Sequence, residues 1–310
     1  MANKKKVKKT TTKKTQSRPA AKPGVKKLTS PERTAVLRTS PFIVIPNNNR
    51  IYNNKAKEKI ARDMLERYTG CSAADFKKQI ILTNFDYYLQ RFDEMYGNKI
   101  ARGTIMTSVH SDSENISLVD FSIGSPNAGL IIELLSVIEP TAVLFLGMTG
   151  GLHRSLKVGD FILPTAAIRD EGTSRHFIPP NVPALPTFKV QKFVSQIIVE
   201  MGHDYRTGVV HTTDYRFWEF DDIFKAKLYE ERALAIDMET ATLFTCGFVS
   251  KVPIGALLLV SDCPLKRGGI KTKKSGKKVF GKFTDLHLEM GIRSMSQIAE
   301  RGEHIRHYKW

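Results

Sequence analysis

Two acidic residues in the C-terminal half of the sequence are the strongest candidates for chemistry. Asp262 follows the apolar run 254–260, which predicts a buried strand, so its carboxyl group should emerge at the end of that strand. Burial raises the pKa of a carboxyl group and lets it act as a general acid near neutrality. Loss of a purine from ribose needs such an acid, because the base leaves poorly unless it is protonated. A role in capping the next turn, 263–265, is the alternative for Asp262.

Glu239 is one of two acids at another strand-to-helix corner. Asp237 and Glu239 bracket the apolar Met238 after the short run 234–236. One of these carboxylates can accept hydrogen bonds from the 2′- and 3′-hydroxyls of a ribose, and its charge would stabilise an oxocarbenium-like transition state. The alternative is that the acids only cap the following helix, whose macrodipole favours negative charge in its first turn.

A cluster of glycines follows another apolar run, 141–146. Gly147, Met148, Thr149, Gly150 and Gly151 predict a glycine loop after a buried strand, where the backbone could approach a ligand closely. The spacing matches neither a dinucleotide-binding nor a Walker pattern, and a simple tight turn is an equal alternative.

Strands and helices alternate along the sequence, which indicates an α/β fold with a mostly parallel sheet and no second domain. Ligands of such sheets bind beyond the carboxyl ends of the strands, where Gly124, Gly147, Glu239 and Asp262 are expected. We expect a catalytic domain over residues 79–310, with an N-terminal extension, 29–78, that packs on it. The expected elements are helices 55–68, 85–96, 128–138 and 238–249, and strands 79–83, 103–110, 116–123, 141–146, 234–236 and 254–260.

The net charge of +17 belongs mainly to the N-terminus. Residues 1–27 hold ten lysines, Arg18 and no acid, so they contribute +11 and leave +6 for the remaining residues. A segment rich in Lys, Thr, Pro and Ala cannot bury enough apolar surface to offset its ordering entropy, and we expect residues 1–28 to be disordered. This tail would serve solubility, or bind polyanions weakly and non-specifically through counterion release.

The three cysteines, Cys71, Cys246 and Cys263, are too widely spaced for a CxxC metal site, and we expect neither a metal nor another cofactor. Their usage fits a reducing compartment. The sequence shows no apolar run long enough to span a bilayer and no secretory signal. We therefore expect a cytoplasmic protein that has no membrane partner.

Taken in order, the motifs resemble those of the nucleoside phosphorylase/nucleosidase family. The resemblance rests on residues 124–128, 147–152, 158–164, 237–241 and 260–262. It implies a three-layer α/β/α sandwich with a central mixed, mostly parallel sheet, assembled as a homo-hexamer. It also implies that Met238 and Glu239 bind the ribose and that Asp262 protonates the purine. The other residues expected to contact the substrate are Gly124, Gly147, Met148, Thr149, Gly150 and Ser261.

Within this family, residues 82–85, 212–219, 236–242 and 259–265 resemble the branch that hydrolyses AMP to adenine and ribose 5-phosphate. The segment 212–219 occupies the place of the base-contacting loop, which makes Tyr215, Arg216 and Trp218 candidates for contact with the purine. An aromatic ring there would stack on the base. Packing in the core or at a subunit interface is the alternative for Trp218.

One departure from the family pattern concerns the nucleophile. Phosphorylases of the family typically hold phosphate with an arginine and a serine or threonine, where this sequence has Phe145 and Met148. Neither side chain can donate a hydrogen bond, so water is favoured over phosphate. The nearest acid after the first strand is Asp86, which could activate the water; a surface position on a helix is the alternative.

A 5′-phosphate on the substrate requires cations, and arginine suits it best. The sequence alone does not rank the candidates, which are Arg50, Arg169, Arg175, Lys266 and Arg267. The basic run 271–278 predicts a mobile loop that could close over the phosphate.

Two other functions stay open. A phosphorylase of purine or uridine nucleosides is the first, because residues 169–177 resemble stretches of uridine-cleaving relatives. The second is a nucleotide-binding protein that the basic tail tethers to nucleic acid.

Overall fold

The computed structural model describes residues 55–96 and 99–301, without the side chains of residues 273–275 and 278. These residues all belong to one structural unit, Pro46–Trp310. The expected disordered tail, 1–28, and the candidate phosphate ligand Arg50 lie outside the described residues.

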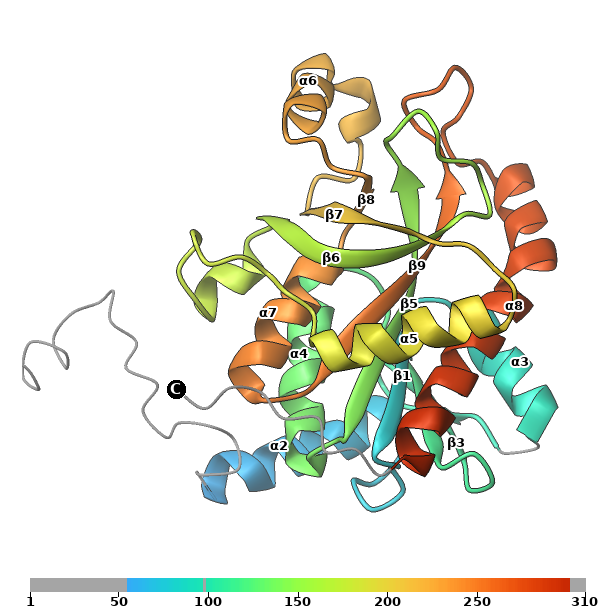
Figure 1. The fold of residues 1–310 in the computed structure, drawn as a ribbon. Coiled ribbons are helices and arrows are strands. Elements are labelled where there is room, and N and C mark those ends of the chain that lie inside the picture. Colours follow the sequence, from blue (N-terminus) through green and yellow to red (C-terminus); the bar gives the residue numbers. More distant parts are fainter. Residues whose placement is uncertain (1–54, 97–98, 302–310) are drawn as a thin grey trace, which may run out of the picture. The chain divides into compact units, whose positions relative to one another are not determined.

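A mixed sheet with helices on both faces forms the centre of this unit, which confirms the expected three-layer α/β fold (Figure 1). The strands are β1 (Gln79–Thr83), β2 (Ala101–Arg102), β3 (Thr107–Ser111), β4 (Ile116–Asp120), β5 (Ala142–Gly151), β6 (Phe161–Asp170), β7 (Arg206–Thr213), β8 (Ala235–Asp237) and β9 (Ile254–Asp262). The α-helices are α2 (Lys55–Thr69), α3 (Asp86–Tyr96), α4 (Ser125–Leu135), α5 (Phe188–Glu200), α6 (Asp222–Glu230), α7 (Thr240–Ser250) and α8 (Lys273–Glu300). Three short 3-10 helices are also described, η2 (Ser136–Ile138), η3 (Thr173–His176) and η4 (Trp218–Phe220).

The strands that lead to the candidate residues run parallel at the centre of the sheet. β1 pairs with β4 and β5, and β5 pairs with β9, all in parallel, so their carboxyl ends lie at one edge. The other half of the sheet closes into a ring. Its strand pairs are β5–β8 and β6–β9, which are antiparallel, and β7–β8 and β6–β7, which are parallel. This closure brings Ile236 of β8 beside Gly150 of β5.

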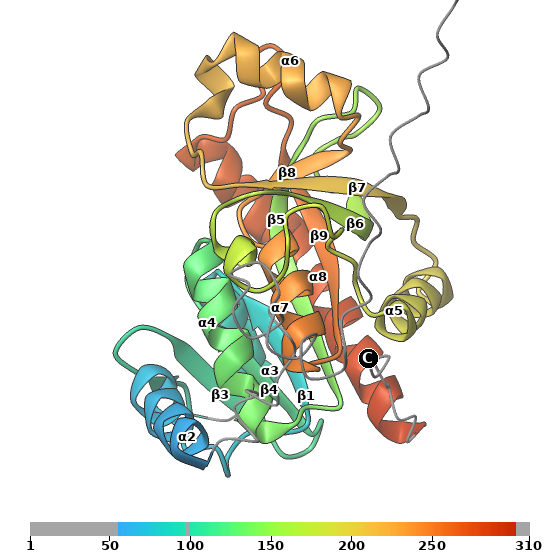
Figure 2. The ribbon, with the colours of Figure 1, turned by 90° about the vertical axis from the view of Figure 1, so that its left-hand side faces the viewer.

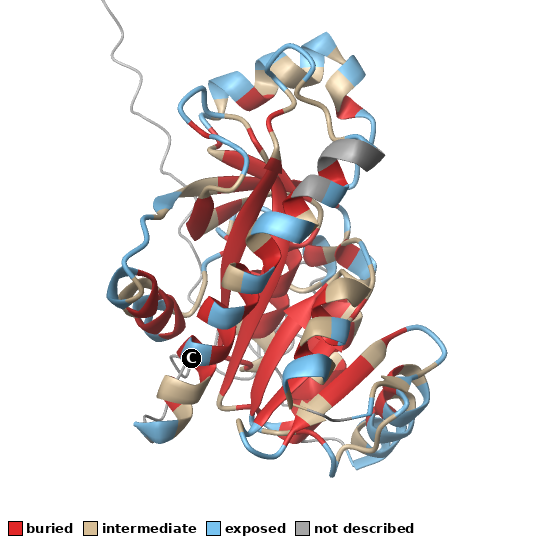
Figure 3. Ribbon diagram, turned by 90° about the vertical axis from the view of Figure 1, so that its right-hand side faces the viewer, coloured by how far each residue is buried: buried red, intermediate tan, exposed pale blue. Residues whose placement is uncertain are grey.

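Each central strand contributes to two hydrophobic cores. Ile80 and Leu82 face the core formed with α4 and α7, whereas Ile81 faces the core formed with α3, α5 and α8. This alternation follows from the two-residue period of a strand, and burial on both faces accounts for the continuous apolar runs in the sequence. Figure 2 shows α4 and α7 side by side, and Figure 3 shows the strands buried between the helical layers. Leu65 of α2 joins the first core, where α2 packs against α4.

Two expectations about loops are wrong. The expected glycine loop is part of β5, which continues to Gly151 because its backbone keeps pairing with β9. Gly147 is needed for close packing within that strand, since a Cβ there would lie 2.4 Å from Cζ of Phe145. From Lys273 onward, the expected loop 271–278 is the start of α8, where buried Val279 joins the second core.

A buried polar chain joins the helices of the second core to the sheet. The hydroxyl of Tyr88 on α3 lies 2.8 Å from Nδ1 of His287 on α8, and Nε2 of His287 lies 2.9 Å from the carbonyl oxygen of Leu257 on β9. The carbonyl only accepts, so Nε2 carries the proton and Nδ1 accepts from Tyr88. Burial lowers the pKa of His287 to about 4, which keeps the ring neutral.

We expect His287 to make the free energy of unfolding fall as the pH drops from 6.5 towards 4. The unfolded histidine takes up its proton near pH 6.5, whereas the folded one does so only near pH 4, so acid favours the unfolded state in this window. The slope due to His287 is at most about 1.4 kcal/mol per pH unit. Urea unfolding at about pH 7.5 and about pH 5 should show a larger loss in the wild type than in His287→Gln, whose amide does not titrate. An equal loss in both proteins would contradict this.

Candidate active site

Glu239 is held by backbone donors of two segments that meet at the carboxyl edge of the sheet. Its Oε1 accepts from the N–H of Gly124 at 2.8 Å, and its Oε2 from the N–H of Met238 at 3.2 Å. Gly124 has φ 96°, which glycine adopts readily, and the Ser125 hydroxyl ties the same segments by donating to the Met238 carbonyl at 2.7 Å. Burial and the neighbouring Asp237 raise the pKa of Glu239, and these hydrogen bonds oppose the shift.

Asp237 takes the structural role that the sequence left open between the two acids. Its Oδ2 accepts from the N–H of Thr240 at 3.0 Å and from the Thr240 hydroxyl. Asp237 therefore caps the start of α7. Its Oδ1 accepts from the Thr212 hydroxyl at 2.6 Å. Glu239 makes no capping hydrogen bond within the described residues and instead faces Gly124 across the edge of the sheet.

Asp262 ends β9 and is partly buried. The Ser261 hydroxyl donates to its Oδ1 at 2.7 Å, and the backbone N–H of Lys271 also donates to the carboxylate. Burial raises the pKa of Asp262, and the Ser261 hydrogen bond and the Lys271 charge oppose that shift. The net rise favours the protonated form, as a general acid requires. Ser261 thereby orients Asp262.

Lys271, the first residue of the basic run 271–278, brings a positive charge to this site. Its Nζ lies 3.5 Å from Sδ of Met148, 5.4 Å from the ring centre of Phe85 and 5.8 Å from that of Phe280. Burial lowers the pKa of Lys271, whereas the charge of Asp262 raises it. Within the described part of the chain, the Met148 sulfur is the ammonium's only hydrogen-bond acceptor, and a thioether accepts weakly. The ammonium is therefore available to an anion.

Phe145 and Met148, the positions that carry phosphate ligands in phosphorylases, supply no hydrogen-bond donor. Phe145 is fully buried with its ring 5.7 Å from that of Phe121, and Met148 is 8% exposed. The hydroxyl of Thr149, an expected substrate contact, is buried and donates to the Ile236 carbonyl at 2.7 Å. Thr149 ties β5 to β8.

Asn84, the first residue after β1, was missed by the sequence reasoning. Its side chain hydrogen-bonds to Glu239, and its Oδ1 is buried with no partner among residues 55–96 and 99–301. The expected residue, Asp86, lies at the surface and accepts from Gln90 at 2.6 Å and from Arg102 at 3.1 Å. A search for any polar side chain directly after the first strand, rather than for an acid, would have found Asn84.

The segment after β7 contributes a pair of opposite charges. Nη1 of Arg216 lies 2.9 Å from Oε1 of Glu219, whose side chain is only 6% exposed. Trp218 is buried in a third, small hydrophobic cluster with Leu228 and Ile236. The expectation that Trp218 stacks on a base is therefore corrected in favour of core packing.

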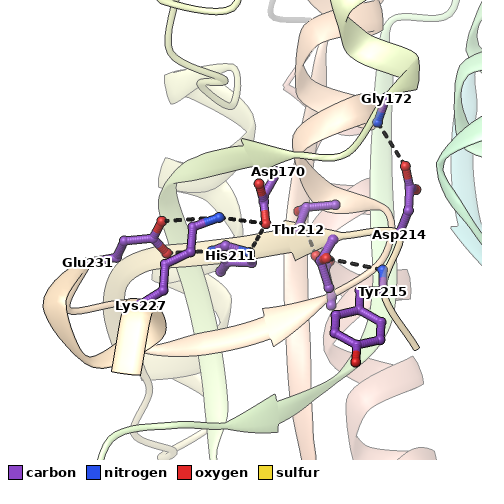
Figure 4. Close-up of polar contacts among 10 residues, drawn as sticks. Asp170, Gly172, His211, Thr212, Asp214, Tyr215, Lys227 and Glu231 are labelled. Atoms are coloured by element: carbon purple, nitrogen blue, oxygen red, sulfur yellow. Dashed lines mark hydrogen bonds and ion pairs between the residues drawn. The ribbon is translucent and has the colours of Figure 1, made fainter. Parts of the chain in front are cut away.

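A charged network anchors this segment to the sheet (Figure 4). His211 of β7 is fully buried, with Nδ1 2.7 Å from Oε2 of Glu231 and Nε2 3.2 Å from Oδ2 of Asp170. Lys227 of α6 reaches the same Asp170 oxygen at 2.8 Å. The end of β7 is thus fixed to β6 and to α6. Tyr215, just beyond β7, stays 44% exposed.

Arg169 is removed from the candidate phosphate ligands. Its guanidinium donates to the hydroxyl and carbonyl of Ser174 and to the carbonyls of Ile178, Pro179 and Val182. These five bonds use all the donors of an arginine, so its role is to hold the segment 174–182.

The other candidate cations lie in two places. Arg175 is exposed on η3, which packs beside α4 and α7. Lys266 and Arg267 line a cavity of about 540 Å³ together with Asp262. The Lys266 ammonium donates to the carbonyl of Leu156 at 2.6 Å. Arg267 is therefore the better candidate of the two for binding a phosphate.

Among the described residues, no group of three or more His, Cys, Asp or Glu side chains could hold a metal ion. In the same part of the chain, no helix is long and apolar enough to cross a membrane.

Comparisons with known proteins identify relatives of two kinds. AMP nucleosidase of Escherichia coli (strain K12) is 30% identical over 290 residues, covering 79% of this chain and 60% of that protein. The chain therefore spans about three fifths of the length of this curated relative. Uridine phosphorylase of Treponema pallidum is 29% identical over 155 residues, covering 47% of this chain and 60% of that protein.

Solved structures agree on the fold. AMP nucleosidase from Bacteroides thetaiotaomicron superimposes with a TM-score of 0.71 at 41% identity, covering 79% of this chain and 98% of that one. The model of the phosphorylase superfamily matches residues 74–285, the span that holds Asn84, Glu239, Asp262 and Lys271. Because this match covers most of the sequence, the chain belongs to the phosphorylase superfamily.

Proposed function

We propose that the protein hydrolyses the N-glycosidic bond of AMP and releases adenine and ribose 5-phosphate. The similarity to AMP nucleosidases from two bacteria supports this substrate. The observation that carries the proposal is the placement of two carboxyl groups in different surroundings at one edge of the sheet. Glu239 accepts hydrogen bonds from backbone N–H groups. Asp262 ends a buried strand and accepts a hydrogen bond from the hydroxyl of Ser261.

Asp262 is the general acid of this proposal. Its raised pKa favours the proton that the leaving adenine needs at N7. Ser261 fixes the carboxyl group on one side, which limits the directions in which the proton can be delivered.

Glu239 accepts hydrogen bonds from the ribose 2′- and 3′-hydroxyls, with Met238 against the sugar. Its negative charge stabilises the positive charge that develops on the ribose as the bond breaks. The backbone N–H groups of Gly124 and Met238 hold the carboxylate in place.

Water is the nucleophile, because Phe145 and Met148 offer no donor to a phosphate. The Oδ1 of Asn84, which has no partner in the described part of the chain, supports a role in holding this water next to Glu239. Asp86 stays a prediction as the activating base, and its surface ion pair with Arg102 makes Asn84 the better supported residue.

Lys271 binds the 5′-phosphate and so selects a nucleotide over a nucleoside. Two aromatic rings and a thioether surround its partly buried ammonium, and a phosphate would supply the oxygen acceptors that it lacks among the described residues. Arg267 at the rim of the neighbouring cavity is a second candidate.

A homo-hexamer and a cytoplasmic location complete the proposal. Phe217, Phe220, Ile223 and Tyr229, in and around η4 and α6, are all more than 60% exposed, which supports burial of this surface against another subunit. The free, widely spaced cysteines support a reducing compartment.

Incubation with AMP or adenosine, with and without inorganic phosphate, tests the proposed reaction. We expect adenine and ribose 5-phosphate from AMP at a rate that does not require phosphate. Ribose 1-phosphate formed from adenosine and phosphate would identify a phosphorylase instead, and no release of base from AMP would refute the proposal.

Asp262→Asn should lower kcat for AMP by about 10²- to 10⁴-fold, because the amide cannot deliver a proton. Adenine release measured at saturating AMP is the readout, and Asp204→Asn, the same change at an exposed position, is the matched control. Full turnover by Asp262→Asn would remove its role as the acid.

Glu239→Gln should lower kcat/KM by about 10²- to 10³-fold, because the neutral amide does not stabilise the charged sugar. Wild-type activity requires ionised Glu239, so it should fall on the acidic side, at a pH above the ordinary range of a glutamate because the Glu239 pKa is raised. A pH profile of kcat/KM tests this, with exposed Glu200→Gln as the control. An acidic limb that persists unchanged in Glu239→Gln would contradict the assignment.

Lys271→Met should raise KM for AMP at least about tenfold and leave KM for adenosine nearly unchanged, since only AMP carries the phosphate dianion. Steady-state kinetics on both substrates provide the comparison. Lys277→Met, an exposed lysine of α8, is the control. Equal effects on AMP and adenosine would show that Lys271 acts elsewhere than on the 5′-phosphate.

A further inference from the structure

Glu219 carries an acceptor that no group in the described part of the chain satisfies. Its side chain is 6% exposed, and its Oε1 accepts from Nη1 of Arg216 at 2.9 Å. Its Oε2 is buried and has no hydrogen-bond partner there. An unpaired buried carboxylate oxygen is costly, and a ligand N–H or O–H would remove that cost.

Packing contacts place Glu219 over the end of the sheet that holds Asp262. The adjacent Trp218 packs on Ile236 of β8. Ile236 is also next to Gly150, whose other close neighbour is Pro264 of the segment that leaves β9. Pro264 is two residues beyond Asp262, so a short series of contacts links Trp218 to the proposed acid. Figure 1 shows α6 and the segment after β9 at this same end of the sheet.

The chemistry of adenine fits an acceptor at this place. Its exocyclic amino group is attached to C6, on the same edge of the ring as N7, and it offers two N–H donors. We propose that Oε2 of Glu219 accepts a hydrogen bond from this amino group, so that Glu219 selects adenine over 6-oxopurines. The proposal rests on the proposed function, because it presumes that Asp262 faces N7.

A 6-oxopurine would meet Glu219 with the wrong polarity. Hypoxanthine and guanine present a carbonyl oxygen at C6, which would face the carboxylate oxygen with no hydrogen between them. A site built around one hydrogen-bond donor rejects an analogue without it strongly, because its own polar group is then left unpaired. The Arg216 ion pair fixes the carboxylate against rotation away from the base.

The charge of Glu219 also acts on Asp262. It contributes to the raised pKa of Asp262, which helps that carboxyl group keep the proton that it transfers. Glu219 would therefore hold the amino group and favour the protonated acid at the neighbouring ring nitrogen.

Binding of free bases to the full chain tests the proposal without requiring turnover. Titration calorimetry with saturating ribose 5-phosphate would measure the dissociation constants of adenine, hypoxanthine and 6-methylpurine. The wild type should bind adenine at least about tenfold more tightly than either analogue. 6-Methylpurine matches adenine in shape and lacks the amino donors, so this comparison needs no protein variant.

Glu219→Gln should lower the preference for adenine over hypoxanthine at least about tenfold, because the amide can donate to the oxo group. Glu230→Gln, the same change at an exposed position of α6, should keep the wild-type preference. An unchanged preference in Glu219→Gln, or wild-type binding of 6-methylpurine as tight as that of adenine, would overturn the proposal. If adenine is selected in this way while AMP is not cleaved, the proposed function fails and the role of Glu219 stands.

Discussion

The corner formed by residues 237–240 controls the geometry of the site. Two carboxyl groups are buried there within three residues, so each needs its own donors to remain in place. Asp237 takes those of Thr212 and Thr240, and Glu239 takes those of Gly124 and Met238. The division of donors holds one acid in the protein and turns the other to the edge of the sheet. The start of α7 and the start of α4 are fixed by the same bonds.

The two hydrophobic cores explain why the chemistry gathers at that edge. Helices cover both faces of the central strands, so a ligand can reach the sheet only beyond the strand ends. Segments far apart in the sequence therefore contribute residues to the same site. In the proposed function, the ends of β1, β4 and β8 bind the sugar, and the segments after β7 and β9 bind the base.

Much of this arrangement was predictable from local patterns. Asp262 was expected at the end of a buried strand and is the last residue of β9, Glu239 lies two residues beyond β8, and β1 lies where its apolar run indicated. The sequence indicated Lys271 only as part of the basic run 271–278, because its neighbours Phe85 and Met148 are distant in the sequence. The prediction that Arg169 binds phosphate failed because its acceptors are mostly backbone carbonyls, which cannot be recognised from residue types. The prediction of a glycine loop at residues 147–151 was wrong because pairing with β9 outweighed the turn preference of glycine.

The small third cluster around Trp218 has a consequence for how specificity can change. The segment that carries Glu219 packs through Trp218, Leu228 and Ile236, and a charged network around His211 holds α6 to the sheet. Neither attachment belongs to the two main cores. Under the proposed function, substitutions between β7 and β8 would therefore alter which base is accepted while the sheet and the corner at residues 237–240 keep their packing. Such a separation lets one scaffold diversify its substrates through a single exchangeable segment.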